Sequence, residues 1–163
     1  MGLTGCVGAG GERTQAPTPS PTPVFASDEA ALAAAEVAYG AYLAGLDGAL
    51  ATLDHAGLED VASGRALAEA LDSVEGFRED EFRLTGQSSY DSASLIHAED
   101  GYVEIYACWD ISGTDIVDES GTPILIRDRP LRYPMQVSLE WVLSKSALVV
   151  SEAEVWDGEN FCA

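Results

Sequence analysis

The chain has 163 residues, of which 47% are hydrophobic, so it is long enough for one domain with its own core and too apolar for a disordered chain. No apolar run reaches the roughly 18 residues that a transmembrane helix needs. The 28 acidic residues outnumber the 8 basic ones, and a net charge of -20 repels nucleic acids and anionic lipid headgroups.

The N-terminal segment carries a motif for lipid attachment, followed by a tether. Leu3-Thr4-Gly5-Cys6 resembles the lipobox of bacterial lipoproteins, in which the cysteine takes a diacylglyceryl group and becomes the N-terminus of the mature chain. The resemblance implies a lipid on Cys6 that holds the protein on the extracytoplasmic face of the cell membrane. Export requires a basic and apolar leader, and because only five residues precede Cys6, we expect the leader to lie upstream of the given sequence.

The Gly-rich and Pro-rich residues that follow predict a spacer between this anchor and the folded part. Residues 7–11 are rich in Gly, and Pro recurs at every second position of residues 17–23. Such stretches form flexible or extended linkers without a core. We therefore predict a disordered tether over residues 1–26 and a single folded domain over residues 27–163.

The cysteine count predicts one disulfide. With Cys6 assigned to the lipid, Cys108 and Cys162 remain as an even pair, which favours a bond between them in an oxidising compartment. A bond that closes so long a loop stabilises the fold by roughly 3–4 kcal/mol in the chain-entropy model. In a cytosolic protein, which is the alternative, both thiols would stay free.

Helices are predicted over the first half of the domain. Ser27 can cap a helix whose apolar stripe consists of Leu32, Tyr39, Leu43, Leu46, Leu50 and Leu53. The glycines of this stretch weaken the helix, so we expect it to bend or end near Gly48. A second helical stretch covers residues 58–81, and Ser63 can cap a helix that begins at Gly64; its buried stripe is Leu67, Leu71, Val74 and Phe77.

Strands are predicted over the second half, where the hydrophobic period changes to two. Asp100-Gly101 is typical of a hairpin turn between two of these strands, and we expect a loop over residues 127–134. The strands are expected at residues 90–97, 102–110, 116–117, 124–126, 135–143 and 147–156. Helices followed by a meander of strands predict an α+β fold, with N-terminal helices packed on one face of an antiparallel sheet of four to six strands.

This order of elements is similar to the cystatin-like cone fold of nuclear transport factors, steroid isomerases and polyketide cyclases. The chain also resembles small lipobox-bearing lipoproteins of high-GC Gram-positive bacteria, which share the anchor, the tether, the Ala-rich helix and a closing segment like residues 155–162. The cone fold implies a curved sheet over an apolar pocket. The aromatic residues that could line such a pocket are Tyr39, Tyr42, Tyr106, Trp109 and Trp141.

Three polar groups are candidates for chemistry. The carboxylates around one turn do not follow the spacing of an EF-hand loop, so we interpret them as solvated side chains rather than calcium ligands; they are Asp110, Asp115, Asp118 and Glu119. His55 and His97 are the two histidines, and no nucleophile is placed with them, so we predict no catalytic residue. We predict no metal and no cofactor.

An arginine cluster stands out on this acidic chain. Arg127, Arg129 and Arg132 lie within six positions of one another. We expect them to pair with the protein's own surplus carboxylates, as surface charges commonly do. The alternative is a site for an anionic ligand or an acidic partner.

Taken together, these features predict a membrane-anchored extracytoplasmic lipoprotein that acts as a non-enzymatic binding or interaction module. Its partner is expected to be a small apolar ligand or a protein, and not a nucleic acid. The alternative is a cone-fold enzyme of the isomerase or cyclase type that acts on a small apolar molecule. An enzyme should hold a carboxylic acid of shifted pKa beside a Tyr or His in a deep pocket, whereas an interaction module should have a filled cone and an exposed patch.

Overall fold

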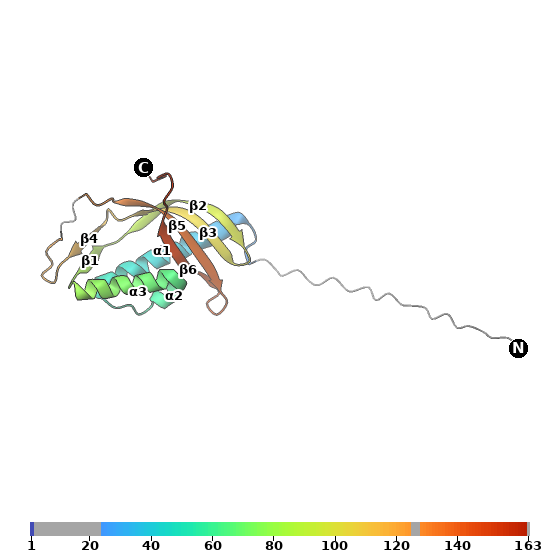
Figure 1. Ribbon diagram of the computed structural model, residues 1–163, viewed down its shortest axis with the longest axis horizontal. Coiled ribbons are helices and arrows are strands. Elements are labelled where there is room, and N and C mark those ends of the chain that lie inside the picture. Colours follow the sequence, from blue (N-terminus) through green and yellow to red (C-terminus); the bar gives the residue numbers. More distant parts are fainter. Residues whose placement is uncertain (2–23, 125–127, 163) are drawn as a thin grey trace.

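The computed structural model describes residues 1, 24–124 and 128–162 and has an α+β fold (Figure 1). In this part of the chain, three helices pack on two antiparallel sheets, which confirms the predicted fold class. The elements in chain order are α1 (Asp28–Thr52), α2 (Leu58–Val61), α3 (Gly64–Glu79), β1 (Arg83–Gly86), β2 (Ser89–Glu99), β3 (Tyr102–Asp110), β4 (Thr114–Val117), β5 (Arg132–Val142) and β6 (Ala147–Val155). The predicted lipid site Cys6 and most of the predicted tether lie outside the described residues.

The long helix α1 begins where the sequence predicts and ends later than expected. The backbone N–H of Ala30 donates to Oγ of Ser27, which caps the helix. The helix continues past Gly48 to Thr52, so the expected end near Gly48 is wrong. Ala49 and Leu50 are buried in a hydrophobic cluster with residues of α2 and α3, and this packing outweighs the helix propensity cost of about 1 kcal/mol per glycine.

The second helical stretch is divided into α2 and α3 by a contact with β6. The N–H of Ser63 donates to the carbonyl of Val150 at 2.8 Å, and Gly64 follows with φ of 52°. A Cβ at this glycine would lie 3.1 Å from the carbonyl oxygen of Ser151, so the close approach requires glycine. Ser63 occupies the N-cap position without a side-chain capping bond. No helix in the described ranges has the length and apolar character needed to cross a bilayer.

Four strands form the main sheet in the order β2-β3-β5-β6, and all neighbours are antiparallel. The β2–β3 hairpin turns at Asp100-Gly101, as predicted. Strand β5 begins at Arg132, inside the expected loop, because Arg132 and Tyr133 pair with Asp110 and Trp109 of β3. Register shifts in β2 and between β5 and β6 interrupt the ladder, and such bulges bend and twist a sheet locally.

Two short strands, β1 and β4, form the small sheet. The sequence did not predict β1, because its one core residue, Leu84, finds its cross-strand partner Ile116 more than 30 positions away. The strand expected at residues 124–126 is represented by Ile124, whose N–H donates to the carbonyl of Ile116 at 2.7 Å. Residues 125–127 lie outside the described ranges.

The core lies between α1 and the inner face of the main sheet. Ala31 and Ala35 of α1 are fully buried, as are Ile105 and Val137 of the sheet. Small side chains on α1 let the helix backbone lie close to the strands, as dense packing requires. All three helices lie on the same side of the main sheet, and the C-terminal segment lies on the other side (Figure 1).

The C-terminal segment is held on the outer face of the sheet by the predicted disulfide. Cys108 of β3 bonds to Cys162, with their Cα atoms 5.5 Å apart. Tyr106, two residues before Cys108, packs against Trp156 and Phe161, with ring centroids 5.1 and 5.3 Å apart. The bond and this aromatic cluster cover the part of the outer face that would otherwise expose Cys108 and Tyr106.

Replacing Cys162 with Ala should lower the free energy of unfolding by about 3 kcal/mol, because the 54-residue separation makes a large loop in the unfolded chain. Urea unfolding followed by tryptophan fluorescence measures the change. Wild type in a reducing agent should unfold at the same urea concentration as the variant. A variant as stable as the oxidised wild type would contradict this role of the bond.

Candidate functional site

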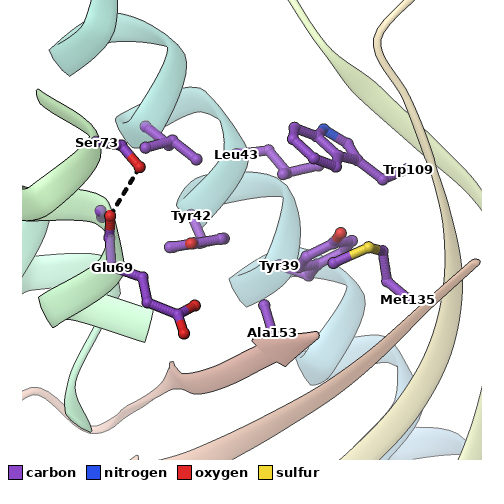
Figure 2. Close-up of a pocket in the computed structure, with 10 residues that line it drawn as sticks. Tyr39, Tyr42, Leu43, Glu69, Ser73, Trp109, Met135 and Ala153 are labelled. Carbon is purple, nitrogen blue, oxygen red and sulfur yellow. Dashed lines mark hydrogen bonds between the residues drawn. The ribbon is translucent and has the colours of Figure 1, made fainter. Parts of the chain in front are cut away.

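A cavity of about 200 Å³ lies between α1, α3 and the main sheet (Figure 2). We call it the aromatic cavity. Its exposed edge is formed by Glu69 and Ser73 of α3, where the Ser73 hydroxyl donates to the backbone carbonyl of Glu69 at 2.8 Å. The lining residues are Tyr39, Tyr42, Leu43, Leu46, Glu69, Ala70, Ser73, Trp109, Met135 and Ala153.

Two tyrosines of α1 supply the polar atoms in the depth of this cavity. Tyr39 and Tyr42 are three positions apart and therefore lie on one face of the helix, with ring centroids 6.4 Å apart. Burial raises the pKa of the Tyr39 phenol, and burial raises the pKa of Tyr42 to about 12. Both phenols are therefore protonated at neutral pH. Neither hydroxyl bonds to another lining residue (Figure 2).

The opposite wall comes from the main sheet. Trp109 of β3 and Met135 of β5 face the tyrosines across the cavity (Figure 2). The Trp109 ring also packs against Tyr133, with centroids 5.8 Å apart. Its indole nitrogen is buried and has no hydrogen-bond partner within the described ranges. The walls of the aromatic cavity are therefore mainly apolar.

The structure brings together three of the five aromatic residues that the sequence proposed for a pocket. Tyr39, Tyr42 and Trp109 line the aromatic cavity. Tyr106 lies on the outer face with Trp156, because it alternates with the inward-facing residues of β3. Trp141 is near the far end of β5, where it packs edge-on against Phe25 at 5.9 Å.

Sequence reasoning missed the contributions of α3, β5 and β6 to the cavity. Glu69 and Ser73 lie on the polar side of the predicted α3 stripe, and Ala153 is a small residue in a strand of mixed polarity. The docking of α3 against the sheet decides which of these residues meet, and no local pattern encodes that docking.

Two of the four acidic turn residues, Asp110 and Asp118, are engaged in local bonds. Asp118 accepts from the backbone N–H and hydroxyl of Ser120 and from the N–H of Thr122, and the Ser120 hydroxyl does most to hold the pKa of Asp118 below its usual value. Asp110 accepts from the N–H of Ser112 at 2.8 Å. Among the described residues, no three His, Cys, Asp or Glu side chains gather as a metal site would require.

The histidines and the arginine cluster are dispersed. His97 lies 3.6 Å from the exposed Glu99 carboxylate on β2, and His55 is exposed in the connection between α1 and α2. Arg132 donates to both carboxylate oxygens of Asp91 at 2.8 and 2.9 Å. Arg129 instead donates to the backbone carbonyl of Thr114 at 2.9 Å, and Arg127 lies outside the described residues.

Replacing Tyr42 with Phe should make the protein more resistant to alkaline unfolding. A tyrosine titrates near 10 in an unfolded chain, and the folded value is about 12. Burial of the protonated Tyr42 phenol therefore contributes fully to the free energy of unfolding below pH 10. This contribution is lost as the pH rises to 12. Between about pH 9 and pH 11, wild type should lose about 1 kcal/mol more free energy of unfolding than the variant. Urea titrations at the two pH values measure this difference, and equal losses would contradict the burial of this phenol.

Comparisons with known proteins identify the fold and no family. No family model and no curated protein sequence matches this chain. The intermembrane space region of the chloroplast protein ARC6 is similar with a TM-score of 0.52 and 18% identity, over 76% of this chain and 95% of that one. Aln2 from a Streptomyces species is similar with a TM-score of 0.50 and 15% identity, over 79% of this chain and 90% of that one. At these identities the likeness concerns the fold alone.

Proposed function

We propose that this protein is a non-enzymatic binding module for a small apolar molecule, held on the outer side of a cell membrane by a lipid on Cys6. The aromatic cavity is the observation that carries the binding part of this proposal. It combines a concave, mainly apolar surface with a few polar atoms, which is the usual composition of small-molecule sites. The rings of Tyr39, Tyr42 and Trp109 give it flat walls for an apolar ligand.

Binding is favoured over catalysis by the position of the titratable groups. General acid–base catalysis requires a titratable side chain within hydrogen-bond reach of the reacting atoms. Glu69 is the carboxylate that lines the aromatic cavity, and it is exposed at the edge rather than in the depth. Neither histidine lines the cavity. The phenols of Tyr39 and Tyr42 are too weakly acidic to act as bases near neutral pH.

The anchor is proposed from the sequence around Cys6. The lipobox-like residues 3–6, the Gly- and Pro-rich segment after them and the strong acidity of the domain fit a protein exposed outside the membrane. The Cys108–Cys162 bond supports the same location, because disulfides persist in oxidising compartments. We further propose that the bulged main sheet and its helices form the cone of the cystatin-like fold.

Binding to the aromatic cavity can be tested with the neutral fluorophore N-phenyl-1-naphthylamine, whose emission rises in apolar surroundings. Replacing Ala153 with Trp should weaken binding by about tenfold or more, because the new ring fills the cavity. Ala147 is exposed on the same strand, and its replacement with Trp should leave affinity within about twofold. If the Ala153 variant binds the probe as wild type does, the cavity is not its site.

Lipid attachment can be tested on protein from the membrane fraction of the source cell. Intact-mass analysis without reduction should show the acyl mass on Cys6 together with the loss of two hydrogens for one disulfide. Replacing Cys6 with Ser should remove the acyl mass and release the protein from the membrane, since the lipid supplies the anchoring energy. An unacylated wild-type chain in the membrane fraction would contradict the proposed anchor.

A further inference from the structure

A second cavity of about 230 Å³ lies on the other side of Trp109, between α1, α3 and the small sheet. We call it the Arg129 cavity. It shares Leu46, Ser73 and Trp109 with the aromatic cavity, so these residues separate the two spaces. The remaining lining residues are Asp47, Leu50, Phe77, Leu84, Ser88, Ile111, Thr114, Ile116 and Arg129.

The apolar part of this cavity is formed by elements that are distant in the sequence. Leu50 comes from α1, Phe77 from α3, and Leu84 and Ile116 from the paired strands of the small sheet. Leu50 and Leu84 are buried, whereas Phe77 and Ile116 are half-buried. A chain of methylene groups placed among these residues would bury apolar surface along its length.

The guanidinium of Arg129 is a charged donor at this apolar site. One of its nitrogens donates to the carbonyl oxygen of Thr114 at 2.9 Å. Within residues 24–124 and 128–162, no carboxylate lies at ion-pair distance from it, whereas Arg65, Arg78 and Arg132 each pair with an acidic side chain. On a chain with 28 acidic residues, this half-buried arginine keeps positive charge and donor groups available.

The indole of Trp109 adds a second donor. Its nitrogen is buried and has no hydrogen-bond partner among the described residues. Figure 2 shows this nitrogen on the edge of the ring that faces away from Tyr39 and Met135. A buried donor without an acceptor is unfavourable, and a ligand that supplies an acceptor would remove this cost.

The acidic group of the same cavity is already satisfied by the protein. Asp47 is 7% exposed. Its carboxylate accepts from the backbone N–H of Ser88 at 2.7 Å and from the Ser88 hydroxyl at 2.9 and 3.1 Å. Among the described residues of this cavity, the indole N–H has no acceptor and the guanidinium has no carboxylate partner, so the chemical group that would complement both is an acceptor.

We propose that the Arg129 cavity binds an apolar carboxylate of the fatty-acid class. The carboxylate accepts from Arg129 and from the indole N–H of Trp109, and the hydrocarbon lies among Leu50, Phe77 and Leu84. Charge-assisted hydrogen bonds to a guanidinium are strong and match carboxylate geometry. The repulsive field of the acidic surface is screened over about 8 Å at physiological ionic strength. This inference goes beyond the proposed binding function, because it assigns a second site with a ligand class of its own.

The test compares decanoate with 1-decanol, which has the same chain and no charge. Affinities are measured from the indole N–H resonances in ¹⁵N-labelled protein, with the Trp109 resonance assigned by its loss in Trp109→Phe. Decanoate should bind at least about tenfold more tightly than decanol and should shift the Trp109 resonance. Equal affinity for both compounds, or decanoate binding without this shift, would overturn the proposal.

The charge is tested with Arg129→Met, which should remove the preference for decanoate and leave decanol affinity within about twofold. Arg129→Lys keeps the charge and should retain most of the preference, which separates loss of charge from loss of folding. The matched control is Arg83→Met, because Arg83 is also half-buried, donates to a backbone carbonyl and lies outside the cavity. If Arg83→Met removes the preference as Arg129→Met does, the assignment to Arg129 is wrong.

The aromatic cavity provides the remaining control. Ala153→Trp fills that cavity and should leave decanoate affinity within about threefold. Loss of decanoate binding in this variant would place the carboxylate in the aromatic cavity and overturn the assignment. If the naphthylamine probe binds and decanoate does not, the carboxylate proposal alone fails. If neither compound binds, the binding function fails with it.

Discussion

The rest of the fold depends on burial of one face of α1. This helix contacts α2, α3 and strands of both sheets, and its residues belong to both hydrophobic clusters of the described residues. Along its buried face, small residues come first and tyrosines follow. Ala31 and Ala35 allow close contact with the sheet, whereas the larger side chains of Tyr39 and Tyr42 line the aromatic cavity beside α3. The aromatic cavity therefore lies beside α3 at the point where the buried side chains of α1 change from small to large.

The two cavities differ from the surface in their hydrogen-bond balance. The surface carries a large excess of carboxylates, and exposed cations such as Arg65 are paired with them. Around Trp109 the balance is reversed, because among the described residues the buried indole N–H has no acceptor and the Arg129 guanidinium bonds to a backbone carbonyl without a carboxylate partner. An apolar interior with spare donors is suited to a ligand with an acceptor, whereas the acidic exterior favours solubility and discourages contact with anionic surfaces.

The outer face of the main sheet is organised differently. The Cys108–Cys162 bond holds the C-terminal segment against β3, and Tyr106, Trp156 and Phe161 pack together beneath it. Tyr106 belongs to this cluster because it alternates with the inward-facing residues of β3. The bond and the cluster together fix the C-terminal segment to the sheet.

Features that depend on neighbours along the chain could be predicted from the amino-acid order. Three such local features are present in the structure. They are the capping of α1 by Ser27, the alternation of inward and outward side chains over Tyr102–Asp110, and the Asp100-Gly101 turn. The cysteine count likewise predicted the disulfide. Tertiary structure alone decided the extension of α1 past Gly48, because its end is stabilised by distant residues of α2 and α3.

Tertiary structure also decided which candidate residues share a site. Strand β1 exists because Leu84 pairs with Ile116, and β5 starts early because Arg132 pairs with Asp110 of β3. Strands and helices that are far apart in the chain are brought together in the fold. Their arrangement separates Tyr106 from Tyr39 and leaves Arg129 without a carboxylate partner among the described residues. Periodicity reports which face of an element is apolar; it carries no information on which other element covers that face.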